Sequence, residues 1–177
     1  MAADSKRLSR SWQEWLDENG DRLLMYARQS THSVAEAEDL LQDAIVRLWK
    51  YQADKNYVPP DLPLAFHTLR FCMLDFGRRK TRTKKRDEKI IDLNRDLDVW
   101  HDPTLEEDEE ARILRKAVHE LSPKLREVMT LKIWGGLTFA AIAETLDISN
   151  NTAASRYRYA LEALQEKLKP LKANRHA

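Results

Sequence analysis

Apolar residues recur along this chain every three or four positions, which is the spacing of an α-helix and not of a β-strand. One helix is predicted to begin near Ser11 and a second after Ser33, where Ser33 and Glu36 have the spacing of a capping box. A third predicted helix, Leu64 to about Arg79, follows the irregular, proline-broken segment Tyr51 to Pro63. The side chains expected in the core of these helices are Trp12, Trp15, Leu16, Leu23, Leu24, Ala27, Leu40, Leu41, Ala44, Ile45, Leu48, Trp49, Phe66, Leu69, Met73, Leu74 and Phe76.

The last third of the chain shows the same periodicity with clearer boundaries. Ser122-Pro123 predicts a helix start, with serine as the N-cap and proline at the first helical position, and Gly135-Gly136 predicts its end. Thr138 is expected to cap a short helix, and the turn 147–149 to lead into a last helix from about Asn150 to Leu168. The apolar positions of these helices are Leu125, Val128, Met129, Ile133, Phe139, Ile142, Ala143, Leu146, Ala153, Tyr157, Ala160, Leu161, Leu164 and Leu168.

A short helix, a tight turn and a longer helix form the order of a helix-turn-helix, whose second helix reads the major groove of DNA. With about 100° per residue, the face of the last helix opposite the apolar one carries groups that can donate to bases or phosphates. These candidate DNA-reading residues are Thr152, Ser155, Arg156, Arg158 and Tyr159. From periodicity alone, an αα-hairpin with a solvated arginine face remains an alternative.

The formal net charge of +1 conceals a strong segregation along the chain. Residues 1–86 carry 16 Lys/Arg against 12 Asp/Glu, residues 87–110 carry 2 against 11, and residues 111–177 carry 12 against 6. The sequence therefore predicts an all-α protein of two small helical domains, 9–86 and 111–170, joined by an acidic flexible linker, 87–110, that has too little apolar surface to order itself.

A basic tract closes the first predicted domain, with Lys or Arg at seven of the nine positions from Arg78 to Arg86. Such a tract gives salt-sensitive, sequence-independent affinity for phosphates. The phenylalanines of the preceding helix (Phe66, Phe71 and Phe76) could offer stacking surfaces for unpaired bases, or could simply belong to the core. The tract could equally be a solvated helix end, or could attract the chain's own acidic linker.

Several classes of function find no support in the sequence. Its histidines (His32, His67, His101, His119 and His176) lack metal-ligand spacing, and none of its four glycines lies in a phosphate-cradling loop, so we expect no enzyme, metal or cofactor. The single cysteine, Cys72, lies in an apolar stretch and is expected to be a core residue. There is no secretory signal and no apolar run long enough for a membrane span, so we expect a cytoplasmic protein.

Two segments of the chain resemble regions of one known family. The segment Ala37-Glu-Asp-Leu-Leu-Gln-Asp-Ala-Ile-Val-Arg-Leu-Trp49 resembles the region-two helix of sigma-70-type transcription initiation factors. The segment Leu121-Ser-Pro-Lys-Leu-Arg-Glu-Val, with the helix-turn-helix from Gly136 to Arg156, resembles region four. With only these two regions and a short linker, the chain resembles the small extracytoplasmic-function (ECF) group. The resemblance extends from about Trp12 to Leu168.

The resemblance implies a promoter-specificity subunit with core RNA polymerase and promoter DNA as partners, and it leaves room for an anti-sigma factor. The residues matching the surface that docks on the polymerase β′ clamp helices are Asp39, Leu40, Gln42 and Asp43. Those matching the part that opens and holds the minus-ten element are Arg70, Phe71, Arg78, Arg79, Lys80 and Arg82. A flipped base would lie against the loop from Tyr51 to Pro63. The helix-turn-helix would read the minus-thirty-five element and touch the β flap, and the linker would thread toward the RNA exit path.

The chain departs from the family pattern at a few positions. Phe71 stands where asparagine is common, Ala154 where a basic residue is common, and Tyr159 where arginine is common. Asp147 replaces the usual turn glycine, and aspartate tolerates the left-handed conformation better than most residues. A stand-alone helix-turn-helix regulator is the alternative, but it would need a dimer helix that the sequence does not show.

Overall fold

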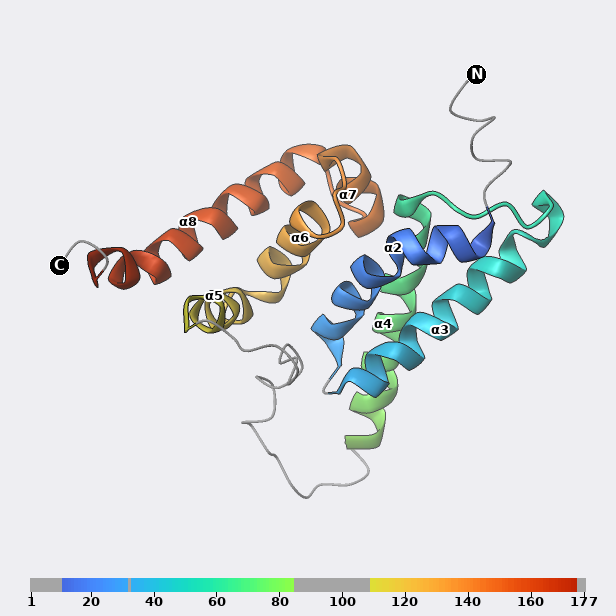
Figure 1. Cartoon of the computed structure of the whole chain (residues 1–177), viewed down its shortest axis with the longest axis horizontal. Helices are drawn as coiled ribbons and strands as arrows, with labels where there is room; N and C mark the ends of the chain where they lie inside the picture. Colours follow the sequence, from blue (N-terminus) through green and yellow to red (C-terminus); the bar gives the residue numbers. More distant parts are fainter. Residues whose placement is uncertain (1–10, 32, 85–108, 175–177) are drawn as a thin grey trace. The chain divides into compact units, whose positions relative to one another are not determined.

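The computed structural model describes residues 11–31, 33–84 and 109–174, and in these ranges every regular element is a helix. The chain divides into two compact units, with the division between Asp92 and Leu93. The expected acidic linker lies outside the described residues except for its last two, Glu109 and Glu110, which begin a helix. Each unit is therefore described by itself (Figure 1).

The first unit is built from three helices, α2 (Trp12–Ala27), α3 (Val34–Tyr51) and α4 (Leu62–Lys84), which contact one another pairwise (Figure 1). Two 3-10 turns, η1 (Arg28–Ser30) and η2 (Ala53–Lys55), follow α2 and α3. Ser11 and Glu14 form a reciprocal capping box at the start of α2. At the start of α3 the Ser33 hydroxyl accepts a hydrogen bond from the Glu36 N–H, as predicted.

The core of this unit lies where the three helices meet, and its largest side chains are aromatic. Tyr26 of α2 and Phe66 of α4 are fully buried and pack edge to face, with ring centroids 5.4 Å apart. Leu23, Leu48 and Leu69 fill the space around them. The predicted core is confirmed at Leu23, Leu48, Phe66 and Leu69, whereas the fully buried Tyr26 had not been assigned to it. Cys72 is also buried as expected, and burial raises the pKa of its thiol.

Two predictions for this unit were wrong. Helix α4 begins at Leu62 and not at Leu64, because the Asp61 carboxylate accepts from the Leu64 N–H at 3.1 Å and Pro63 falls in the first turn, where no N–H is needed. Trp49 and Leu74 were assigned to the core, but both are exposed, Trp49 by 48 %. Each follows a buried position, Leu48 or Met73, and lies about 100° farther round its helix, beyond the side that packs against the other helices.

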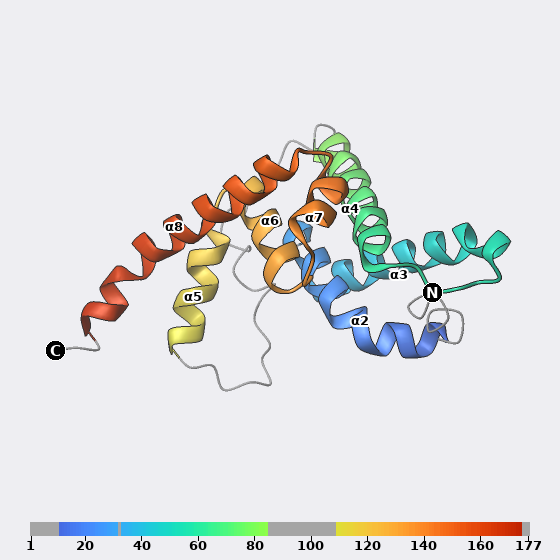
Figure 2. The ribbon, with the colours of Figure 1, turned by 90° about the horizontal axis from the view of Figure 1, so that it is seen from above.

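The second unit contains α5 (Glu109–His119), α6 (Pro123–Ile133), α7 (Phe139–Leu146) and α8 (Asn150–Asn174). Figure 2 shows α8 running past α7 and α6 toward α5, and all three contact it. Their shared core comprises Ala117, Val118, Leu121, Met129, Ala160 and Leu164. The long helix α8 is therefore the element on which the rest of the unit packs.

The turns of the second unit follow the sequence closely. The Thr138 hydroxyl accepts from the Ala141 N–H and caps α7, and Asp147 ends that helix in the left-handed conformation with φ 54°. Gly135 is required by space, because a Cβ there would lie 2.5 Å from the carbonyl oxygen of Leu131. Gly136 has a backbone φ of 66°, in the left-handed region that glycine enters without a steric penalty.

Other details of the second unit differ from expectation. Ser122 precedes α6 but its hydroxyl makes no capping hydrogen bond; its carbonyl oxygen accepts from the Leu125 and Arg126 N–H groups instead. Ile133 and Leu161 were assigned to the core and are exposed, Ile133 by 53 %. Helix α8 continues six residues beyond the expected end at Leu168.

Candidate nucleic-acid and protein interfaces

An acidic face runs along the exposed side of α3. Asp39, Gln42 and Asp43 are all exposed there, within one turn of each other. Leu40, which the sequence placed on this face, is only 6 % exposed and belongs to the core of the unit. The face is therefore polar, and Leu40 can contribute to it only by holding the helix in place.

Arg47 connects this acidic face to α4. Its guanidinium lies 3.3 Å from the Asp43 carboxylate on the same helix and 3.9 Å from Asp75 on α4. The same guanidinium lies 5.7 Å from the ring centroid of Phe71. Asp75 in turn lies 3.7 Å from Arg78. A chain of alternating charges thus crosses from α3 to the start of the basic tract, which the sequence pattern did not predict.

The basic tract begins on the last turns of α4. Arg78 and Arg79 are exposed, and Arg70 is half-buried earlier on the helix. Phe71 is 49 % exposed, so it is not a core residue. Arg82 lies in α4, but its side chain is outside the described part of the chain, as are Lys85 and Arg86 altogether. These positions leave a cationic and aromatic surface on the outer side of α4.

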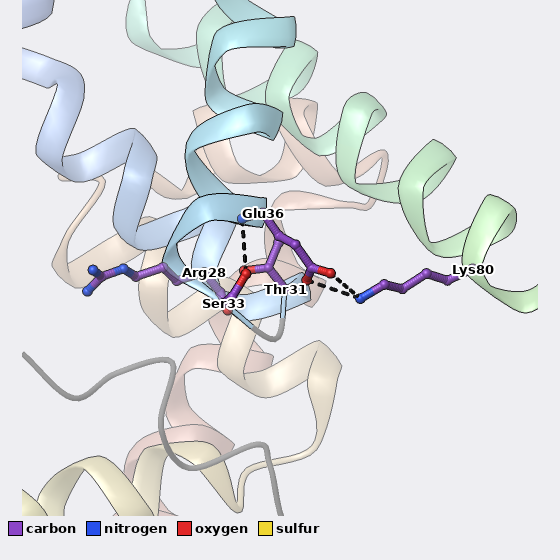
Figure 3. A network of polar contacts seen from close by, with 5 residues as sticks. All are labelled: Arg28, Thr31, Ser33, Glu36 and Lys80. Atoms are coloured by element: carbon purple, nitrogen blue, oxygen red, sulfur yellow. Dashed lines mark hydrogen bonds and ion pairs between the residues drawn. The ribbon is translucent and has the colours of Figure 1, made fainter. Parts of the chain in front are cut away.

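Lys80, also in the basic tract, binds a partner on another helix. Its Nζ lies 2.9 Å and 3.1 Å from the two carboxylate oxygens of Glu36, 44 residues earlier in the chain. Figure 3 shows it reaching from α4 to the first turn of α3. The ammonium also lies 4.7 Å from the ring centroid of Phe76. Lys80 was predicted to contact DNA, but here its charge is used to join two helices.

The loop between α3 and α4 presents aromatic rings to solvent. Trp49, at the end of α3, stacks on Tyr57 with ring centroids 4.6 Å apart and an interplanar angle of 28°. Tyr51 is exposed as well, and the Lys55 ammonium lies 4.6 Å from its ring centroid. The sequence named this loop as the place for a flipped base but did not identify these rings. The apolar spacing gave no signal for these rings, because the same spacing assigned Trp49 to the core.

The helix-turn-helix of the second unit presents the N-terminus of α8 outward. The Ser149 hydroxyl accepts from the Thr152 N–H at 3.1 Å, and the two hydroxyl oxygens lie 2.8 Å apart. On the opposite side of the helix, Ala153 and Ala160 are completely buried. The first turn of α8 is thus fixed both by its cap and by close packing.

The predicted DNA-reading residues lie together on the outer side of α8. Thr152, Ser155 and Arg156 are half-buried near the start of the helix, while Arg158 and Tyr159 are exposed. The Arg158 guanidinium lies 5.2 Å from the Tyr159 ring centroid and 3.8 Å from the Glu162 carboxylate. The ion pair on this face therefore joins two residues of α8 that lie one helical turn apart.

The described part of the chain shows neither a metal site nor a membrane-spanning helix. Within residues 11–31, 33–84 and 109–174, no group of histidine, cysteine and acidic side chains has the arrangement of a metal site. Across the same described ranges, no helix combines the length and apolar character that crossing a membrane requires. The features that remain are charged and aromatic surfaces suited to macromolecular partners.

Comparison with known proteins identifies both units. The family model for Sigma-70 region 2 matches residues 15–83, and that for Sigma-70, region 4 matches residues 111–164. The chain is 30 % identical over 160 residues to the RNA polymerase sigma-E factor of Streptomyces avermitilis, covering 89 % of this chain and 84 % of the relative. It is 25 % identical over 165 residues to the ECF RNA polymerase sigma factor SigL of Mycobacterium tuberculosis, covering 90 % and 89 %.

Among solved structures, the fold is similar to that of the sigma factor RpoE in its complex with the anti-sigma factor NepR from Bartonella quintana. The TM-score is 0.71 at 23 % sequence identity, over 89 % of this chain and 96 % of that chain. At this identity the likeness concerns the fold alone. It agrees with the all-helical arrangement that the periodicity predicted.

Proposed function

The chain belongs to the extracytoplasmic-function group of sigma-70-type RNA polymerase sigma factors, and we propose which of its surfaces carry each step of that function. It is a promoter-directing factor, so it binds core RNA polymerase and brings it to particular promoters. Sigma factors are initiation factors and not catalysts. The proposal assigns polymerase binding to α3, the minus-ten element to α4 and the loop before it, and the minus-thirty-five element to α8.

The acidic face of α3 is the proposed polymerase contact. Asp39, Gln42 and Asp43 are exposed and adjacent, and two carboxylates beside an amide complement a basic partner surface. Leu40 is excluded as a direct contact because it is buried. Asp43 already pairs with Arg47, so docking would exchange this intramolecular partner for one on the polymerase.

The outer side of α4 is the proposed minus-ten surface. Arg78 and Arg79 are exposed cations suited to phosphates, and Phe71 offers an exposed ring to an unpaired base. Arg70 and Arg82 belong to the proposal through their matching positions. We assign Lys80 a secondary role in DNA binding, because its ammonium must break the ion pair with Glu36 before it can bind a phosphate.

The N-terminal half of α8 is the proposed reader of the minus-thirty-five element. Recognition helices place their first turns in the major groove, and here those turns carry Thr152, Ser155 and Arg156. Arg158 and Tyr159 lie farther along the same side. Arginine donates two hydrogen bonds to guanine, and the hydroxyl groups can donate to bases or phosphates. We assign Arg156 the principal role in base selection.

The observation that carries the proposal is the presence of both surfaces in one chain, in the order that the two matched regions have in this family. A stand-alone regulator would use the α8 surface but has no need of an exposed acidic face on α3. We extend the proposal to the cytoplasm as the place of action. An anti-sigma factor is a candidate further partner, because the structural neighbour was solved with one.

The decisive experiment is reconstitution with core RNA polymerase, followed by run-off transcription from a genomic fragment library. We expect the chain to co-purify with core polymerase and to give promoter-specific transcripts. Tight binding of the free chain to DNA without core binding would overturn the proposal in favour of a regulator.

The α3 face is tested by the triple variant Asp39→Lys, Gln42→Lys and Asp43→Lys, which should abolish core binding through charge repulsion. The matched control places the same three changes on the exposed side of α2: Gln13→Lys, Asp17→Lys and Asp21→Lys. Both variants change the net charge equally. If both lose core binding to the same extent, the effect is one of net charge and the α3 assignment is wrong.

A further inference from the structure

The loop between α3 and α4 contains two consecutive residues in a conformation that side chains rarely adopt. Asn56 has φ 52° and Tyr57 has φ 53°. Asparagine tolerates this region, but for a bulky tyrosine it is unfavourable and persists only where surrounding contacts hold it. Beneath the turn, the buried side-chain oxygen of Gln52 has no hydrogen-bond partner within the described residues. Strain and an unsatisfied acceptor together are typical of functional loops.

The contacts that hold Tyr57 come from three separate elements. Its N–H donates to the Gln52 carbonyl at 2.9 Å, and its ring stacks on Trp49 of α3. Its own carbonyl oxygen accepts a hydrogen bond of 2.5 Å from the indole Nε1 of Trp12, the first residue of α2. Trp12 is fixed in turn by the buried Trp15, whose ring lies edge-on at 5.8 Å. The left-handed turn is therefore attached to the core through Trp12.

We propose that Trp12 is a positioning residue for DNA melting: its indole N–H holds the Tyr57 carbonyl and so keeps the loop in the shape that receives an unpaired base. This inference rests on the proposed function of the loop. It adds a residue that the family match does not include, since the region 2 match begins at residue 15. The tryptophan side chain combines an aromatic body that packs on Trp15 with an indole N–H that donates to this carbonyl.

The exposed groups of the loop explain why its shape matters for a nucleotide. Tyr57 remains 43 % exposed on the Trp49 stack, and Tyr51 is exposed beside the Lys55 ammonium. Aromatic faces next to a cation suit a base and its phosphate. A base flipped from the duplex costs a few kcal/mol to extract, so a loop already in its binding conformation gives tighter capture than one that must first be ordered.

The test uses Trp12→Phe in the full-length chain bound to core polymerase. Phenylalanine keeps a ring against Trp15 but removes the donor. The probe is a fork template whose non-template minus-ten strand is already unpaired, compared with a series in which one position at a time is abasic. The wild-type holoenzyme should identify the captured base as the abasic position that weakens binding most.

The expected result is a base-dependent loss. Trp12→Phe should weaken binding to the intact fork by about threefold to tenfold, the effect of one hydrogen bond, and by less than about twofold on the template abasic at the captured position. The matched control, Trp134→Phe, makes the same change in the second unit, which contributes nothing to this loop, and should weaken binding to the intact fork by less than about twofold.

An equal loss of binding on every template, including the abasic one, would show that Trp12 only stabilises the unit. No loss of binding on the intact fork would show that the hydrogen bond is irrelevant. Either result overturns the proposal. Binding to core polymerase and to a duplex minus-thirty-five fragment should be unchanged and reports that the variant is folded. Failure of the wild-type chain to bind core polymerase at all would instead overturn the proposed function.

Discussion

The two units of this protein present their charged surfaces in different ways. In the first unit, charges on α3 and α4 pair across helices: Arg47 lies between Asp43 and Asp75, and Lys80 binds Glu36. In the second unit, the ion pair of the outer α8 face, Arg158 with Glu162, lies within one helix. The first surface depends on how the helices pack, whereas the second depends mainly on helix geometry and a cap.

This difference indicates two kinds of binding. A surface whose charges already pair internally must exchange partners when it binds, so its affinity for a new partner is reduced by the contacts that it gives up. On the outer α8 face the ion pair lies within one helix, so binding there breaks no contact between helices. We therefore expect the first unit to be the adaptable part of the protein and the second to be the rigid reader.

The largest expected effect tests whether the two units are independent. Phe66→Ala removes a fully buried ring from the first core and should destabilise that unit by about 3–5 kcal/mol. Ile142→Ala is the matched change in the second unit, with an expected loss of about 2–5 kcal/mol. Calorimetry of the full chain should show each variant lowering one transition only. A single transition that both variants shift together would contradict the division into two units.

A smaller effect is expected at the reading face of α8. Arg156→Ala should reduce discrimination at one position of the minus-thirty-five element by about 1–3 kcal/mol, because a bidentate contact to a base is lost. The measurement is the competition of a duplex series, altered one base pair at a time, for the holoenzyme. The comparison variant is Arg158→Ala, farther along the same face, where the loss of discrimination should be smaller because that guanidinium already pairs with Glu162. Uniform weakening over all duplexes would show that Arg156 touches phosphate and not a base.

The smallest effect concerns the internal pairing of the first unit. Glu36→Gln removes the carboxylate that binds Lys80 but leaves the backbone N–H that Ser33 caps. Loss of this partly exposed pair should cost about 0.5–1 kcal/mol of stability. The freed ammonium should also steepen the dependence of minus-ten binding on salt, by about one unit of logarithmic slope at most. An unchanged slope would mean that Lys80 does not reach the DNA.

Most of the fold could be predicted because its signals are local. Ser33 and Thr138 cap helices where the sequence placed the caps, a helix starts at Ser11 as expected, and Asp147 turns the chain where a glycine is usual. Two signals were misleading. Pro63 suggested a loop although a proline fits the first turn of a helix, and Ser122 suggested a side-chain cap that the structure does not form.

The candidate surfaces could be predicted less completely. Periodicity assigns a residue to a face, but a residue at the edge of that face is buried or exposed according to what packs against it. Trp49, Leu74, Ile133 and Leu161 were therefore assigned to the core and are exposed. Leu40 is buried as its apolar spacing predicted, although the family resemblance placed it on the docking surface. On α3 the acidic face is exposed as expected, and on α8 Arg158 and Tyr159 are exposed, whereas the other predicted reading residues are half-buried.

The sequence by itself determined the helices, their caps, the two charged surfaces and the family, since each depends on residues only a few positions apart or on matched motifs. The tertiary structure decided which of those charges and rings are engaged inside the protein. Glu36 and Lys80 are 44 residues apart, and Trp12 and Tyr57 are 45 apart. Only packing brings such residues together, because the spacing of side chains along one helix carries no information about the helix that lies beside it.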